Sequence, residues 1–156
     1  MDKIRWCLKS KNGLELVEPN DNLCQAYLKK AEEALESMAE VTNRDWKIST
    51  AYYSMYFSLY SVMMKAGVKC EIHSCTLEFM KQFLSEYFTG DECMLIQTAY
   101  KARVDAQYYV SKLVSDDAYE EISDSVPEFL AKCKAIGKKL DEKKIADIRA
   151  KIGKLM

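Results

Sequence analysis

Apolar side chains recur at three- and four-residue intervals along most of the chain, most clearly between residues 51 and 62. Tyr52, Tyr56 and Tyr60 stand four residues apart there, with apolar residues in the adjoining rows. On an α-helix this spacing places the side chains on one broad stripe. A stripe of that width predicts a helix that packs against several partner helices.

The same periodicity predicts four further helices, because capping residues and glycines bound the other apolar rows. The first covers residues 21–41, and the tyrosine helix follows a capping pair, Thr42 and Asp45, and closes at Gly67. A third covers 74–88. A fourth follows Thr89-Gly90-Asp91 and carries an apolar row that includes Tyr109 and Leu113; a fifth starts at Ser115, reaches Leu140 and is kinked or restarted at Pro127.

Short connections between these helices predict antiparallel neighbours, and hence an all-α, up-and-down antiparallel bundle of four to five helices. With 5 glycines and 2 prolines in 156 residues, and no alternating strand pattern, a sheet has little support. We expect residues 1–20 to form a short arm or helix laid across the body, residues 21–140 to form the bundle, and residues 141–156 to form an amphipathic basic tail with short apolar rows.

Charge and cysteine content narrow the class of protein. The formal net charge is −1, yet residues 1–11 carry +3, residues 138–156 carry +4 and the body between them −8. No apolar run approaches the roughly twenty residues that span a bilayer, so no membrane partner is expected. The six cysteines lie singly along helical patterns with no secretory leader before them, which favours a reduced, cytoplasmic protein.

Cys70, His73 and Cys75 are close enough in sequence to raise the question of a metal site. Zinc sites usually combine two such clusters or a CxxC pair, and the chain has neither. We therefore expect no bound metal, and we expect no cofactor because the chain has no glycine-rich phosphate loop.

Four stretches of the chain carry a family resemblance. They are Ala51-Tyr52-Tyr53-Ser54-Met55, Lys65-Ala66-Gly67-Val68-Lys69, Ile72-His73-Ser74, and Arg103 with Ala106-Gln107-Tyr108. In this order they resemble the core helix, the glycine turn, the opening of the next helix and the fourth-helix pattern of the HEPN domain family. The resemblance covers roughly residues 22–137.

HEPN membership implies an antiparallel helical bundle, commonly a homodimer, often produced with a small nucleotidyltransferase of the MNT type as a toxin–antitoxin-like module. Many such bundles cut RNA without metal through an arginine followed four to six residues later by a histidine. This chain departs from that motif: the corresponding window after Arg103 holds Tyr108, Tyr109 and Val110, and the only histidine is His73. The branch that the chain resembles most generally lacks the RNase histidine.

The departure matters because an imidazole shuttles protons near neutral pH, whereas a phenol, with a pKa of about 10, does not. Arg103 can still hold a phosphate by bidentate hydrogen bonds. We expect a non-catalytic partner of a nucleotidyltransferase that binds nucleotide or RNA phosphate. The candidate site residues are Arg103, Tyr52, Tyr53, Gln107 and Tyr108.

Two other functions stay open. One is a metal-independent RNase that uses Arg103 with His73, and the other is a purely structural interaction or dimerisation module. Structural roles for the same residues are core packing for the tyrosines, a surface ion pair between Arg103 and Asp105 or Glu78, and fixing of the crossing loop by His73.

Tyr108 and the tail have roles suggested by resemblance and by composition. In some HEPN modules the nucleotidyltransferase transfers AMP to a tyrosine beside the RNase motif, and Tyr108 is the candidate here. The tail, residues 141–156, mixes lysines with acids and holds no aromatic residue, so it suits a dimer contact or a groove on another helix better than nucleic acid.

Overall fold

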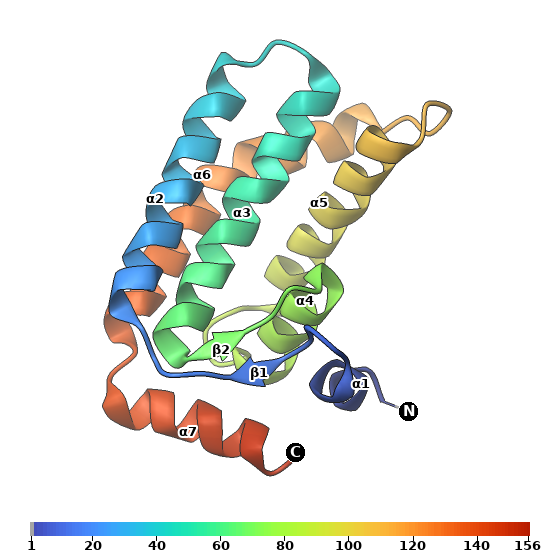
Figure 1. The fold of residues 1–156 in the computed structure, drawn as a ribbon. Coiled ribbons are helices and arrows are strands. Elements are labelled where there is room, and N and C mark those ends of the chain that lie inside the picture. The colour runs from blue at the N-terminus through green and yellow to red at the C-terminus, as the bar shows by residue number, and fades with distance from the viewer. Residues whose placement is uncertain (1) are drawn as a thin grey trace.

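Four long helices dominate the computed structural model, which describes residues 2–156 (Figure 1). They are α2 (Asp21–Glu40), α3 (Arg44–Ala66), α5 (Gly90–Tyr108) and α6 (Asp116–Lys139). They run alternately up and down, and α3 contacts each of the other three. The predicted all-α antiparallel bundle is confirmed.

The shorter elements gather at one end of the bundle, which we call the base, and both chain termini lie there (Figure 1). These elements are α1 (Lys3–Lys9), β1 (Glu15–Leu16), β2 (Val68–Lys69), α4 (His73–Phe83) and α7 (Glu142–Gly153). The strands β1 and β2 form a two-stranded antiparallel ladder, which the sequence pattern did not predict.

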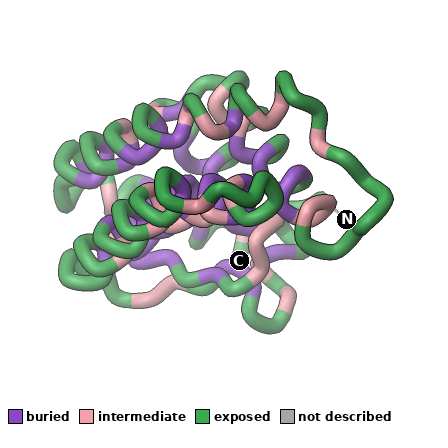
Figure 2. The backbone as a smooth tube through the Cα atoms, turned by 90° about the horizontal axis from the view of Figure 1, so that it is seen from above, coloured by how far each residue is buried: buried purple, intermediate pink, exposed green. Residues whose placement is uncertain are grey.

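Helix α3 is the centre of the core because it is buried on nearly all sides. Figure 2 shows that buried segments of the chain gather in the interior and exposed segments lie on the outside. Tyr52, Met55 and Leu59 have no exposed surface. The small Ser54 donates a hydrogen bond to the carbonyl of Ala31 in α2 at 2.8 Å. A small residue at this contact lets the two helices approach closely, and its hydroxyl has a partner.

Capping residues fix where the long helices begin and end. Asn20 accepts from the amide of Leu23 at 2.9 Å at the start of α2. The start of α3 corrects the sequence prediction, because Asn43, not Thr42, accepts from the amide of Trp46 at 3.1 Å. Gly67 ends α3 with φ of 74°, as predicted, and a Cβ there would lie 2.5 Å from the carbonyl oxygen of Val17. Only glycine fits that conformation and that space.

Three helix ends differ from the sequence predictions. Helix α4 ends at Phe83 rather than near 88, and the following turn buries Leu84 and Phe88 in the core. Helix α5 ends at Tyr108, so Leu113, predicted to lie on its apolar row, is 92% exposed. Helix α6 passes through Pro127 without a restart, because a proline there removes a single backbone donor.

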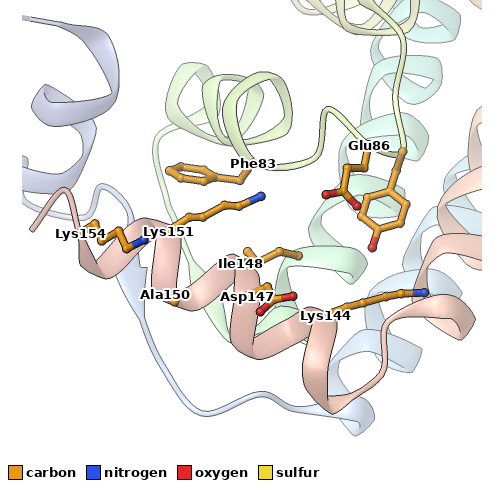
Figure 3. A pocket seen from close by; sticks show the side chains of 9 residues that line it. Phe83, Glu86, Lys144, Asp147, Ile148, Ala150, Lys151 and Lys154 are labelled. Carbon is orange, nitrogen blue, oxygen red and sulfur yellow. The ribbon is translucent and has the colours of Figure 1, made fainter.

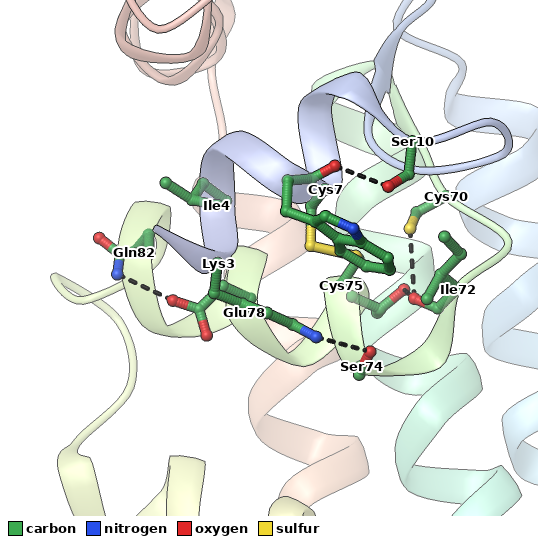
Figure 4. The surroundings of a disulfide bond; sticks show 12 residues. Lys3, Ile4, Cys7, Ser10, Cys70, Ile72, Ser74, Cys75, Glu78 and Gln82 are labelled. Carbon is green, nitrogen blue, oxygen red and sulfur yellow. Dashed lines mark hydrogen bonds between the residues drawn. A yellow bond between two sulfur atoms is a disulfide. The ribbon is translucent and has the colours of Figure 1, made fainter. Parts of the chain in front are cut away.

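A disulfide between Cys7 and Cys75 joins α1 to α4, with Cα atoms 5.6 Å apart (Figure 4). The expectation of six reduced cysteines is therefore wrong for these two, while Cys24, Cys70, Cys93 and Cys133 are free. The two bonded residues lie 68 positions apart on separate helices. Such a pairing depends on how the helices pack, and sequence spacing carries no sign of it.

The three residues considered for a metal are engaged separately. Cys75 is in the disulfide, the thiol of Cys70 donates to the carbonyl of Ile72 at 3.3 Å, and Nδ1 of His73 lies 2.7 Å from the hydroxyl of Tyr52. Within residues 2–156 no group of three or more His, Cys, Asp or Glu side chains is placed to hold a metal ion.

The C-terminal tail is the helix α7, which lies across the base. Ile148 and Ile152 are buried against the body. Nη1 of Arg149 donates to the carbonyls of Val17 and Gly67, each at 2.7 Å. None of the helices over residues 2–156 combines the length and the apolar character needed to cross a membrane.

Candidate functional site

An arginine and an unusual number of aromatic rings converge where α3, α5 and the first turn of α4 meet. We call this group the Arg103 cluster, and it comprises Arg103, Tyr52, Tyr53, Tyr100 and His73. The guanidinium carbon of Arg103 lies 5.2 Å from the ring centre of Tyr52 and 5.5 Å from those of Tyr53 and Tyr100. A cation over several aromatic faces is attracted by each ring quadrupole.

The close approach of α5 to α3 explains why these side chains meet. Ala99 and Ala102 are buried on the α5 face that packs on α3. Because alanine is small, Arg103, the next residue, is carried inward and is only 7% exposed. This burial argues against the surface ion pair that the sequence suggested for Arg103.

The polar contacts of Arg103 are few for a guanidinium, which has five N–H donors. Its Nη1 donates to Oε1 of Gln107 at 3.1 Å and to the hydroxyl of Tyr53 at 3.4 Å. Its Nε is buried without a hydrogen-bond acceptor. Nor does Arg103 form an ion pair with any carboxylate in the described chain.

The two acids considered as surface partners of Arg103 contact other side chains. Asp105 lies 3.8 Å from the ammonium of Lys112, and Glu78 accepts from the amide of Gln82 at 2.9 Å. Arg103 is thus a largely buried positive charge without a partner of opposite sign within residues 2–156. Such an arrangement costs free energy unless something else compensates it.

His73 is the first residue of α4 and is held by two tyrosines. Its ring stacks on Tyr56 with centroids 4.1 Å apart, and its Nδ1 is 2.7 Å from the hydroxyl of Tyr52. Burial, with a smaller contribution from the charge of Arg103, lowers the pKa of His73 from 6.5 to about 4. The imidazole is therefore neutral at pH 7. It is not a helix cap, because Ile72 holds that position without a side-chain bond.

The tyrosine row of α3 packs the core with its hydroxyls bonded at the edge, as predicted. The hydroxyl of Tyr56 lies 3.4 Å from Oγ1 of Thr76, and that of Tyr60 accepts from the amide of Cys70 at 3.1 Å. Burial raises the pKa of both Tyr52 and Tyr56 well above the ordinary value. These phenols stay protonated in the physiological range.

The predicted site residues divide into two groups. Tyr52, Tyr53 and Gln107 contact Arg103 or lie over it. Tyr108, the last residue of α5, is 65% exposed and is in none of the contacts of Arg103.

Sequence reasoning missed Tyr100 and the residues of a neighbouring pocket. Tyr100 precedes Arg103 by three residues, so it lies on the same face of α5, a spacing that could have identified it. The pocket, of about 260 Å³, lies between the start of α3 and the end of α5. It is lined by Asn43, Asp45, Trp46, Ser49, Ala106 and Gln107.

A second hollow, of about 230 Å³, lies between α7 and the end of α4 (Figure 3). Its lysines, Lys144, Lys151 and Lys154, share the lining with the acids Glu86 and Asp147. The carboxylates offset much of the attraction for an anion, so this hollow is a weaker candidate than the Arg103 cluster.

Comparison with known proteins adds no family assignment. No protein-family model matches the chain, and a search of curated proteins finds no significant match.

The chemistry available at the Arg103 cluster is that of recognition. It offers a fixed guanidinium with a free Nε–H donor, neutral phenol donors, and an imidazole held neutral. The buried positive charge favours an anionic ligand, and two oxygens of a carboxylate or a phosphate match the fork of the guanidinium. Acid catalysis at neutral pH would require a proton donor with a pKa near 7, which neither His73 nor the buried phenols provide.

Proposed function

We propose that this protein is a non-catalytic helical bundle of the HEPN type that holds the phosphate of a nucleotide or of RNA at Arg103. One observation carries the proposal: Arg103 is almost fully buried, faces three tyrosine rings, and has no carboxylate partner and a free Nε–H donor within the described chain.

The energetics favour an anionic guest. Removing a charge from water costs free energy, and each cation–π contact offsets only about 0.5 to 2 kcal/mol of that cost. A phosphate oxygen is a stronger acceptor than the neutral Oε1 of Gln107, which now occupies Nη1 at 3.1 Å. Gln107 lies at the end of α5 and is exposed, so it can swing aside and let an oxyanion bridge Nη1 and Nη2, the two terminal nitrogens of the guanidinium.

The proposed partner is a small nucleotidyltransferase of the MNT type, with the bundle itself a homodimer. The support for this part is the sequence resemblance of residues 22–137 to HEPN domains. Co-purification under native conditions with a nucleotidyltransferase encoded beside this protein is the expected result. Repeated absence of such a partner would remove this part of the proposal and leave the phosphate site to be tested separately.

The phosphate site is tested by calorimetry with ATP and with a short single-stranded RNA. Arg103→Ala should lower the affinity at least about tenfold, since a charge-assisted bidentate contact contributes roughly 1.5 to 3 kcal/mol. Arg5→Ala is the matched control, because Arg5 is 59% exposed and lies on α1, and it should change the affinity less than about twofold. Equal loss in both variants would indicate general charge attraction and would contradict the proposal.

A second candidate, an RNase using Arg103 and His73, is favoured by one specific observation: His73 joins the Arg103 cluster although it lies on another helix. Against it stands the pKa of about 4, which leaves His73 able to accept a proton at pH 7 but not to donate one as imidazolium. Incubation with cellular RNA should leave the RNA intact. Cleavage that both Arg103→Ala and His73→Ala abolish would establish this second function instead.

A further inference from the structure

The pocket between α3 and α5 adjoins the Arg103 cluster, and Gln107 is the side chain that both share. Gln107 lines the pocket, and its Oε1 accepts from Nη1 of Arg103 at 3.1 Å. On α3, Ser49 lines the pocket and Tyr53, one turn further along the same face, contacts Arg103. A ligand that places an anionic group at Arg103 therefore has room, about 260 Å³, for a further group beside it.

Trp46 gives this pocket a flat aromatic wall. The side chain is 63% exposed, which is unusual for tryptophan. Within residues 2–156 its ring is in none of the aromatic or cation–π pairs, in contrast to Trp6, which has Lys3 over its ring at 4.8 Å. An unpaired indole face at the wall of a pocket is suited to stacking on a planar ring.

The polar groups of the pocket indicate which planar ring it suits. Asp45 lies in the first turn of α3, is exposed, and forms none of the ion pairs of the described chain. A carboxylate accepts two parallel hydrogen bonds, and guanine offers two adjacent donors, N1–H and the 2-amino group. Adenine offers only its 6-amino group in this position.

Charge also orients the ligand. Asp45 repels a phosphate, whereas Arg103, beyond Gln107, attracts it. The nucleobase of the ligand therefore lies at the Trp46 end of the site, and the phosphate lies at the Arg103 end. When a phosphate replaces Oε1 of Gln107 on Arg103, the side-chain amide of Gln107 is released, and its nitrogen can then donate to the nucleobase or the ribose.

We propose that this pocket binds the base of a purine nucleoside 5′-phosphate, guanine ahead of adenine, by stacking on Trp46 and by hydrogen bonds to Asp45. The inference rests on the proposed phosphate site at Arg103 and specifies its ligand. The shared chemistry is a purine with a 5′-phosphate, either as a free nucleotide or within single-stranded RNA.

The experiment uses Trp46 as its own reporter. The chain has 2 tryptophans, so Trp6→Phe leaves Trp46 as the only one. In that background the full-length protein is titrated with GMP, AMP, guanosine, ribose 5-phosphate and a five-nucleotide guanine-rich RNA. Emission of Trp46 should be quenched by GMP and less by AMP, while ribose 5-phosphate should bind in calorimetry without quenching. A higher affinity for the RNA than for GMP would identify single-stranded RNA as the source of the ligand. A higher affinity for GMP would identify the free nucleotide.

Variants then separate the base from the phosphate. In calorimetry, Trp46→Ala should lower the affinity for GMP at least about tenfold and change the affinity for ribose 5-phosphate less than about twofold. The reason is that stacking on Trp46 contributes only to binding of the nucleobase. Trp46→Phe, which keeps an aromatic face, should fall between. Asp45→Asn should remove most of the preference for GMP over AMP. Both side chains are exposed, so these substitutions should leave the fold intact, and circular dichroism checks this.

The outcomes distinguish this inference from the function on which it rests. If GMP and ribose 5-phosphate bind with equal affinity, and Trp46→Ala changes neither affinity, the proposed nucleobase pocket is overturned and the phosphate site remains. Guanosine and GMP binding equally, with no effect of Arg103→Ala, would overturn the phosphate site instead. Absence of binding by every ligand would overturn both.

Discussion

Two arginines in this molecule lie at helix contacts and have opposite surroundings. At the base, Nη1 of Arg149 lies between 2.7 and 3.3 Å from the backbone carbonyls of Val17, Ala66 and Gly67. In the Arg103 cluster, the guanidinium meets three tyrosine rings, one hydroxyl and one side-chain amide, and its Nε has no acceptor.

The difference indicates a structural role for Arg149 and supports the proposed binding role of Arg103. The carbonyls that Arg149 meets include those at the end of α3, where a helix leaves acceptors without partners. The cation complements the negative end of the helix dipole as well. Arg103 has no such task, and its buried charge is explained better by a ligand than by the fold. The base should therefore control stability, and the Arg103 cluster should control binding.

The largest effect is expected at the disulfide, which joins α1 to α4 within the base. Closing a loop of 68 residues restricts the unfolded chain, and the chain-entropy argument gives about 4 kcal/mol of stabilisation. Reduction of Cys7–Cys75 should lower the urea midpoint accordingly, while the affinity for nucleotide stays within about twofold in native buffer.

Thiol counting provides the control for that measurement. The denatured, unreduced chain should expose 4 reactive thiols, one for each free cysteine, and 6 after reduction. Cys93→Ser, which removes a free thiol, should leave the urea midpoint unchanged. Six reactive thiols before reduction would mean that no disulfide joins α1 to α4.

Replacing each arginine by an apolar residue should have a smaller effect than reducing the disulfide. One substitution should lower stability, and the other should lower nucleotide affinity. Arg149→Ala removes the side-chain donor to the carbonyls of Val17 and Ala66, whereas the carbonyl of Gly67 keeps a backbone amide at 2.9 Å, and the change should cost about 2 to 3 kcal/mol of unfolding free energy. Arg103→Met removes a buried charge and keeps most of the side-chain volume, so stability should change by less than about 1 kcal/mol in either direction. Nucleotide affinity should respond the other way, falling only in Arg103→Met.

Urea unfolding and nucleotide calorimetry on the native chain, Arg149→Ala and Arg103→Met test this contrast between the two arginines. If Arg103→Met lost as much stability as Arg149→Ala, the guanidinium of Arg103 would be a structural element. The proposed phosphate site would then lose its main support.

The bundle was predictable because helical periodicity and caps are local properties of the chain. Asn20, Gly67 and Ser115 mark helix boundaries within a residue or two of where they occur. Errors arose where a tertiary contact overrode the local pattern. Leu113 continues the apolar row of α5 in sequence, yet the helix ends at Tyr108 and Arg44 from α3 donates to the carbonyl of Val114 at 2.8 Å beyond it.

The candidate site was predictable only in part, for a related reason. Arg103, Tyr52 and Tyr53 were identified by resemblance, and they do lie together. The burial of Arg103 depends on the closeness of α5 to α3, and no sequence pattern gives that distance. The disulfide and the pocket beside Trp46 likewise require residues from two helices whose register is set by packing.

The smallest effect concerns His73, which links the two regions because it lies in the Arg103 cluster two residues before Cys75. Its pKa in the folded protein is about 4, below the ordinary 6.5. Between these values the unfolded chain binds a proton that the folded chain does not, so stability is lost as pH falls from about 6.5 to 4. Because the ring is only half-buried and solvent screens the charge, we expect a loss of about 1 to 2 kcal/mol.

The measurement is the unfolding free energy in urea at several pH values between 4 and 7, for the native chain and for His73→Gln. Glutamine can still accept from the hydroxyl of Tyr52 but does not titrate, and His73 is the only histidine, so the difference between the two curves isolates this group. The wild type should lose stability relative to the variant as the buffer becomes acidic. Parallel curves would mean that the imidazole is as solvated as in the unfolded chain, and that the Arg103 cluster is more open than its packing indicates.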